Sequence, residues 1–180
     1  MAGINGLKVI QGDLTHQVVD AIVNPSQKDP LIKPTGLSWR IHQAAGPGLT
    51  EECNQLAIPE VSKTVVTKGY NLAAKWIIHT VSPVWQNGSH REDYLLAKCY
   101  KNCFALIEQY NIKTIALPPI GTGFEKFHFP LSIAINIAIK ECDSFLNSQA
   151  LLEQIIIVCA DDVIFSSCCR SLKNLAFYKE

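Results

Sequence analysis

Apolar residues along the chain follow two spacings, one typical of strands and one typical of helices. Short runs rich in β-branched and aromatic residues predict strands. These runs are Leu7–Gln11, Asp20–Asn24, Val61–Lys68, Trp76–Val81, Thr114–Leu117 and Glu153–Cys159. The last two are apolar at nearly every position, which predicts central strands covered on both faces. The second run is expected to end at Pro25, before a loop over Pro25–Thr35.

Other stretches carry apolar residues three and four positions apart, as amphipathic helices do. They are the segment from Leu37 to the stop at Gly46-Pro47-Gly48, a short helix at Thr50–Leu56, and Arg91–Tyr110, Leu131–Phe145 and Ser166–Phe177. Alternation of the two patterns predicts an α/β fold with a largely parallel sheet and helices on both faces. The short link between Val61–Lys68 and Trp76–Val81 leaves these two strands either antiparallel or near neighbours.

Composition narrows the class of protein. A chain of 180 residues, 48% of them hydrophobic, is expected to form one domain over 1–180 and not to be disordered. Sixteen basic residues balance sixteen acidic ones, so no general field attracts duplex nucleic acid or an anionic membrane. The beginning of the chain has no signal-like pattern and nowhere are eighteen apolar residues uninterrupted, so we expect a cytoplasmic protein.

Cysteine usage argues against metal and disulfide chemistry. The seven cysteines are an odd number, and no Cys-x-x-Cys pair has a matching second pair. We expect buried free thiols in a reducing compartment, with no metal site and no cofactor.

A glycine loop is the first candidate for chemistry. Gly121-Thr122-Gly123 lies between the strand Thr114–Leu117 and the helix that begins after Pro130. Glycines let backbone N–H groups approach a ligand, and a strand-to-helix loop of this kind suits a phosphate. An ordinary tight turn between strand and helix explains the same letters. In a parallel sheet this loop would share one edge with Asn24 and with Ala160–Phe165.

Several short motifs follow one another along the chain. They are Gly12-Asp13-Leu14-Thr15, Val19–Asn24, Ile41–Pro47, Gly69–Leu72, Ile78–Trp85 and Ile120–Gly123. In this order they resemble the motifs of the macrodomain, a module that binds ADP-ribose. The resemblance runs from about Leu7 to about Cys159 and implies a three-layer α/β/α macrodomain with a mixed, largely parallel central sheet. The implied partner is ADP-ribose or an ADP-ribosylated macromolecule.

The resemblance also implies roles for particular residues. Asp13 would accept a hydrogen bond from the adenine amino group, with the backbone of Leu14 beside the ring; an Asx-turn is the alternative role of Asp13. The diphosphate would lie between two loops, and Asn24 would face the distal ribose. The loop residues are Gly36 and Leu37 on one side and Gly121, Thr122, Gly123, Phe124 and Glu125 on the other.

Departures from the family pattern put catalysis in doubt. Hydrolytic macrodomains resemble one another in an Asn-Ala-Ala-Asn motif, a glycine run and an aspartate; this chain has Gln27 for the second asparagine, Gly36 alone, and Ser38 for the acid. A serine is no general base at neutral pH without an activating partner. His42 survives, either as a catalytic residue or as a hydrogen-bonded histidine of the cleft. His79 is expected to be structural.

The two ends of the implied cleft differ as well. Glu125 would place a negative charge near the diphosphate unless its side chain turns outward. Ala160 precedes Asp161 where macrodomains often carry an aromatic residue, so a stack worth about 1–3 kcal/mol is missing unless Phe165 replaces it.

Three functions follow as expectations. The first is binding of ADP-ribose or ADP-ribosyl groups with weak or absent hydrolase activity. The second is removal of ADP-ribose from protein, or of acetyl from O-acetyl-ADP-ribose, with a water positioned by Asn24 and assisted by His42. The third is a macrodomain repurposed for another nucleotide or a protein partner.

Overall fold

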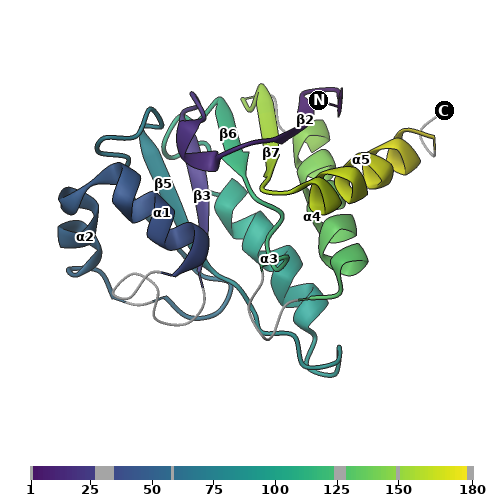
Figure 1. Ribbon diagram of the computed structural model, residues 1–180, viewed down its shortest axis with the longest axis horizontal. Coiled ribbons are helices and arrows are strands. Elements are labelled where there is room, and N and C mark those ends of the chain that lie inside the picture. The colour runs from purple at the N-terminus through teal and green to yellow at the C-terminus, as the bar shows by residue number, and fades with distance from the viewer. Residues whose placement is uncertain (1, 27–34, 58, 124–128, 149–150, 178–180) are drawn as a thin grey trace.

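One mixed β-sheet forms the centre of the molecule (Figure 1). The structure is a computed structural model that describes residues 2–26, 35–57, 59–123, 129–148 and 151–177. Within these residues the strands are β1 (Ala2–Ile4), β2 (Leu7–Gln11), β3 (Ala21–Ser26), β4 (Thr64–Lys68), β5 (Trp76–Val81), β6 (Thr114–Leu117) and β7 (Gln154–Cys159). Their order in the sheet is β1-β2-β7-β6-β3-β5-β4.

The direction of the strands confirms the expected sheet. The strands β2, β7, β6, β3 and β5 are parallel to their neighbours in this series, whereas β1 and β4 pair antiparallel at the two edges. The open question about β4 and β5 is thereby resolved as antiparallel. Strand β1 was not predicted. Its signal is Asn5-Gly6, with φ of 41° and 84°, because this dipeptide favours a tight hairpin turn.

Helices cover both faces of the sheet. The described helices are α1 (Gly36–Ala45), α2 (Pro47–Cys53), α3 (Glu92–Phe104), α4 (Leu131–Ser148), α5 (Asp162–Phe177) and a short 3-10 turn, η1 (Leu14–His16). Helices α1 and α2 pack on one face, and α3, α4 and α5 pack on the other. The predicted three-layer α/β/α arrangement is confirmed.

Strict alternation along the strands supplies the two apolar layers. Ile22 of β3, Ile77 of β5 and Ala116 of β6 face α1 and α2, in what we call the smaller core. Their sequence neighbours Val23 and Ile115 face α3, α4 and α5, in the larger core. Successive side chains of a strand point to opposite faces, so a residue's parity decides which layer it joins.

Strand β3 and helix α3 end at residues other than those predicted, and strand β4 begins at Thr64 rather than Val61. Strand β3 continues through Pro25 to Ser26, which lies opposite Val81 of β5. Strand β6 pairs with β3 only at Ala21 and Ile22, so Pro25 lies beyond the two-sided part of the ladder, where a missing N–H is tolerated. Helix α3 ends at Phe104 rather than Tyr110, because tighter turns then bring Ile107 into the larger core.

Two helices begin earlier than predicted. Gly46, at φ 84°, ends α1 and starts α2, and Pro47 occupies the first turn of α2, where its missing N–H costs nothing. Helix α5 begins at Asp162 rather than Ser166. A carboxylate oxygen of Asp161 accepts from the N–H of Ile164 at 2.8 Å, so Asp161 caps the helix.

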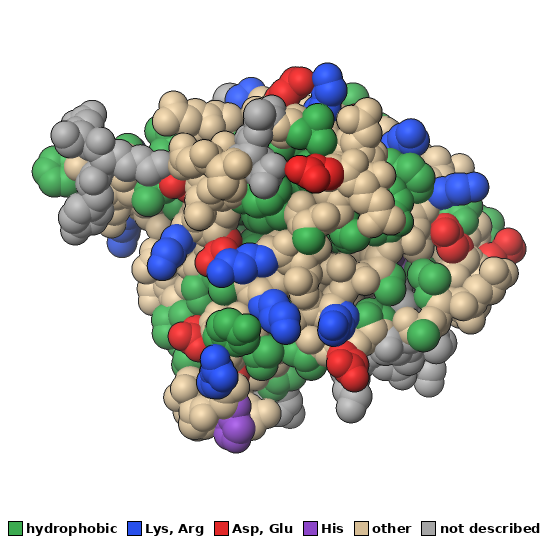
Figure 2. Space-filling view, turned by 180° about the vertical axis from the view of Figure 1, so that it is seen from behind, with side chains coloured by type: hydrophobic (Ala, Val, Ile, Leu, Met, Phe, Trp, Pro, Cys, Tyr) green, Lys and Arg blue, Asp and Glu red, His purple; other side chains and the backbone are tan. Residues whose placement is uncertain are grey.

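The cysteines are free thiols, and the surface carries charges of both signs. All seven cysteines are free, and only Cys169 is not buried. In the described part of the chain, groups of His, Cys, Asp and Glu that could hold a metal are absent. No described helix is long and apolar enough to cross a bilayer. Figure 2 shows basic side chains interspersed with acidic ones on the face seen there.

Candidate functional site

The carboxyl ends of the parallel strands gather the predicted loops at one edge of the sheet. Gly12 and Asp13 follow β2, residues 118–123 follow β6, and Ala160 and Asp161 follow β7. The N–H of Gly12 also bonds to the carbonyl of Cys159 at 3.0 Å, which ties the first and last of these loops together. Ligands in open α/β sheets bind at this edge.

Asp13 is held as a charged acceptor. Its Oδ1 accepts from the Thr15 backbone N–H and hydroxyl, both at 2.8 Å, so it makes the predicted alternative, an Asx-type turn, and caps η1. Its Oδ2 lies 3.7 Å from a guanidinium nitrogen of Arg40. Burial raises the pKa of Asp13, but the bonds from Thr15 and the charge of Arg40 outweigh it and hold that pKa below its ordinary value. One acceptor oxygen therefore remains for a ligand donor.

Arg40 is a residue that sequence reasoning missed. It extends from α1 toward Asp13, with an exposed side chain, while Leu14 beside Asp13 is buried in the smaller core. Only the fold brings α1 to the loop after β2, so no spacing in the sequence could have signalled this pair.

Three glycines border open space. Among the described residues, a Cβ added to Gly12, Gly36 or Gly123 would meet nothing within 4 Å, whereas the other seven glycines have neighbours at that distance. Gly36 has φ 54°, a conformation that itself favours glycine, whereas neither a positive φ nor packing against described residues explains Gly12 and Gly123. Gly36 and Gly123 lie in the two predicted diphosphate loops, and Gly12 directly precedes Asp13. Close approach of a ligand to bare backbone is the other common reason for a glycine. Leu37 beside Gly36 is half-buried in the first turn of α1.

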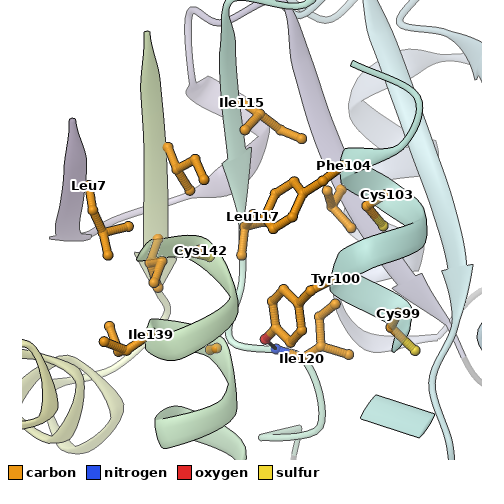
Figure 3. Packing of buried hydrophobic residues seen from close by; sticks show 14 of the residues in the cluster. Leu7, Cys99, Tyr100, Cys103, Phe104, Ile115, Leu117, Ile120, Ile139 and Cys142 are labelled. Atoms are coloured by element: carbon orange, nitrogen blue, oxygen red, sulfur yellow. Dashed lines mark hydrogen bonds between the residues drawn. The ribbon is translucent and has the colours of Figure 1, made fainter. Parts of the chain in front are cut away.

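The loop after β6 is held from below. The N–H of Ile120 donates to the hydroxyl of Tyr100 on α3 at 2.7 Å (Figure 3). Gly121 has φ 87°, and a Cβ there would lie 3.0 Å from the ring of Phe129, so it requires glycine for its own conformation. The Thr122 hydroxyl donates to the Pro119 carbonyl at 2.7 Å, which closes the turn.

Asn24 lies on β3 in a buried polar cluster. Its side-chain nitrogen is 3.1 Å from the Ser38 hydroxyl and 3.1 Å from Nδ1 of His79, while its carbonyl oxygen has no hydrogen-bond partner among the described residues. The residue is 0% exposed. A buried acceptor without a protein partner is rare, which makes this oxygen a candidate contact for a ligand.

His42 and Ser38 do not form the contact that their spacing allows. Nδ1 of His42 lies 3.1 Å from the Thr50 hydroxyl of α2, and Ser38 bonds to Asn24 instead. Burial lowers the pKa of His42, and its Nε2 is buried with no hydrogen-bond partner in the described ranges of the chain. The hydrogen-bonded alternative for His42 therefore has a named partner, while a catalytic role stays a prediction.

The remaining predicted residues fall into two groups. Asp161 caps α5 and Phe165 packs against the larger core from the first turns of that helix. Both are thus occupied by contacts within the protein, and their ligand roles stay predictions. Phe124 and Glu125, with Gln27, lie outside the described residues.

Together, the sheet order and the helices on both faces define a three-layer α/β/α protein with a glycine-lined edge that could hold a ligand. The family model described as "Macro domain" matches residues 23–138. This chain belongs to the macrodomain family.

Relatives and solved structures agree with that assignment. A macro domain-containing protein of Methanosarcina mazei is 41% identical over 171 residues, covering 95% of this chain and 88% of that protein. An O-acetyl-ADP-ribose deacetylase of Salmonella newport is 40% identical over 160 residues, covering 87% of this chain and 88% of that protein. The Oceanobacillus iheyensis macrodomain with ADP superposes with a TM-score of 0.89 at 28% identity, covering 98% and 96% of the two chains.

Proposed function

We propose that this macrodomain binds ADP-ribose, or ADP-ribosyl groups on macromolecules, with weak or absent hydrolase activity. The observation that carries the proposal is the open space beside Gly12, Gly36 and Gly123. Backbone N–H groups without side chains on both sides of this sheet edge suit a diphosphate, and the ionised carboxylate of Asp13 at the same edge suits a base at one end of the ligand.

The base and sugar ends have candidate contacts. Asp13, held ionised, offers an acceptor oxygen to an exocyclic amino group, which suits adenine. Asn24 offers an unpaired carbonyl oxygen for the distal ribose. A mutant of the Oceanobacillus iheyensis macrodomain was solved with ADPR; it is 28% identical to this chain and superposes with a TM-score of 0.88.

Weak catalysis is proposed because the described site lacks a carboxylate where the family resemblance places one. Ser38 occupies that position, is 3% exposed, and its hydroxyl accepts from the Asn24 amide. A serine hydroxyl loses its proton only far above neutral pH unless a base beside it accepts that proton. The group that contacts the Ser38 hydroxyl is the amide of Asn24, which is not a base.

Calorimetry with free ADP-ribose tests the binding proposal. We expect heat that saturates, and reduced affinity in Asp13→Asn, which keeps the shape but loses the charge. Absence of heat at millimolar ADP-ribose overturns the proposal. A thermal-shift panel in which another nucleotide stabilises the protein while ADP-ribose does not would identify a repurposed pocket.

Hydrolysis is the second candidate, favoured by the unpaired carbonyl of Asn24. A water bound there could attack an ester or glycosidic carbon beside the diphosphate. Single-turnover release from O-acetyl-ADP-ribose and from an ADP-ribosylated acidic side chain, lost in an Asn24→Ala variant that still melts cooperatively, would establish it. No release from either substrate supports the binding function alone.

A further inference from the structure

The strand register aligns three polar side chains across the face that α1 and α2 cover. Asn24 of β3 lies directly opposite His79 of β5, and His79 lies opposite Val65 of β4. Thr67 is two residues beyond Val65, so it points to the same face and reaches His79 diagonally. All three are buried, at 0%, 1% and 1% exposed.

Hydrogen bonds connect the three side chains in series. Nε2 of His79 is 2.9 Å from the Thr67 hydroxyl, and Nδ1 of His79 is 3.1 Å from the Asn24 side-chain nitrogen. The same nitrogen is 3.1 Å from the Ser38 hydroxyl. Both amide hydrogens of Asn24 therefore have acceptors, and within the part of the chain that the structure describes its carbonyl oxygen has no donor.

The reverse orientation of the amide satisfies fewer groups. With oxygen and nitrogen exchanged, Ser38 and His79 would donate to the oxygen, and the two N–H groups would be left at the position of the unpaired atom. Two orphaned donors are costlier than one orphaned acceptor, and buried unpaired N–H groups are the rarer kind. The arrangement with His79 as acceptor at Nδ1 and donor at Nε2 is the one the contacts favour.

We propose that Thr67 and His79 are positioning residues that fix Asn24 as a hydrogen-bond acceptor toward the ligand. The ligand group that this acceptor takes is a hydroxyl, and under the proposed function, on which this inference rests, it is a hydroxyl of the distal ribose. Asn24 could not serve a phosphate or a carbonyl oxygen in that orientation, since those groups are acceptors too. The site would thus reject ligands that place an acceptor there.

The charge state of His79 supports the role. Burial, and then the charge of His42, lower the pKa of His79 to about 3. The imidazole is neutral at working pH, so it can accept at one nitrogen while donating at the other.

Nitrogen-15 NMR of the imidazoles tests the orientation without any ligand. In the unmodified protein, we expect His79 to carry its proton on Nε2, with Nδ1 unprotonated, throughout the range from neutral to mildly acidic pH. A proton on Nδ1 would mean that Asn24 faces the ligand with its amide hydrogens, and that result overturns the inference.

A pair of variants tests the effect on ligand choice. Thr67→Val removes the acceptor for Nε2–H, so the His79 proton should move to Nδ1 and turn the Asn24 amide; Thr67→Ser keeps the hydroxyl and is the matched control. We expect Thr67→Val to weaken ADP-ribose about 5- to 100-fold, as for one mismatched buried hydrogen bond. ADP, which lacks the distal ribose, should bind both variants and the unmodified protein equally.

Equal weakening of ADP and ADP-ribose by Thr67→Val would mean a general structural role and would refute the inference, as would unchanged binding of ADP-ribose. If the unmodified protein binds no ADP-ribose, the proposed function fails, while the imidazole spectrum still decides the orientation of Asn24. The two failures are therefore distinguishable, and the spectrum needs no variant to fold.

Discussion

Replacing Tyr100 by phenylalanine should loosen the glycine loop from beneath. Tyr100 is 1% exposed, and its hydroxyl accepts from the N–H of Ile120, one residue before Gly121. Without that oxygen, a buried N–H has no acceptor. Such an orphan costs about 1–3 kcal/mol.

That cost converts into a measurable melting shift. For a chain of this size, each kcal/mol moves the melting temperature by about 2–4 °C, so the Tyr100→Phe variant should melt about 2–12 °C lower. ADP-ribose should also bind more weakly, because the loop proposed to hold the diphosphate no longer has a fixed start. Scanning calorimetry and titration calorimetry measure the two effects.

Tyr94→Phe is the matched control. Tyr94 lies on the same helix but is 51% exposed, and its ring contacts Arg91 rather than the loop. This variant should melt and bind as the unmodified protein does. A Tyr100→Phe protein with unchanged melting temperature and affinity would show that the Ile120 N–H finds another acceptor, and the reasoning would be refuted.

Three further predictions concern acid, charge and backbone. The pKa of His79 is lowered to about 3 in the folded protein, so below pH 6.5, the ordinary histidine pKa, the unfolded chain binds more protons than the folded one. The free energy of unfolding should therefore decrease by up to about 1.4 kcal/mol for each pH unit between pH 6.5 and pH 3. Chemical denaturation at pH 7 and pH 5 measures this, with the exposed His90→Gln variant as control, and equal stabilities at the two pH values contradict it. Arg40→Gln should raise the pKa of Asp13, measurable by carboxyl NMR titration, because one of the influences lowering it is removed; an unchanged titration would mean that the 3.7 Å pair does not persist in solution. Gly123→Ala should leave the melting temperature unchanged and weaken the binding of ADP-ribose. Gly121→Ala should instead cost about 1–2 kcal/mol of stability, because Gly121 has a φ of 87°. A Gly123→Ala protein with a lowered melting temperature would contradict the conclusion that Gly123 borders open space.

Most of the fold could be predicted from the sequence, because buried parallel strands leave near-continuous apolar runs. β6 and β7 were recognised on that basis, with Thr114–Leu117 matching to the residue. Boundaries failed where tertiary packing or a cap outweighed the local pattern. Pro25 remains in β3 because at that position the strand pairs with β5 alone, so the missing N–H of proline is tolerated. Helix α5 begins ahead of the predicted Ser166 because Asp161 caps it.

The candidate site could be predicted in part. Local motifs predicted roles for Asp13, Asn24 and the glycines. Gly12, Asp13 and Gly123 follow strands that end at the same edge, and Asn24 lies on β3. Arg40, Thr67 and Tyr100 could not be found in this way. Each acts on a residue in another element of the fold, so its partner is visible only after folding.

The buried cysteines have a consequence for handling the protein and for following its unfolding. Burial raises the pKa of the Cys103 and Cys142 thiols well above the ordinary range, and burial and nearby Glu52 raise the pKa of Cys53 to about 11. Few thiolates are then available for alkylation or oxidation in the folded state. Since Cys169 alone is partly exposed, further modification by a thiol reagent would require the core to open. The rate at which a thiol reagent modifies each buried cysteine can thus report how often the layer around that cysteine opens.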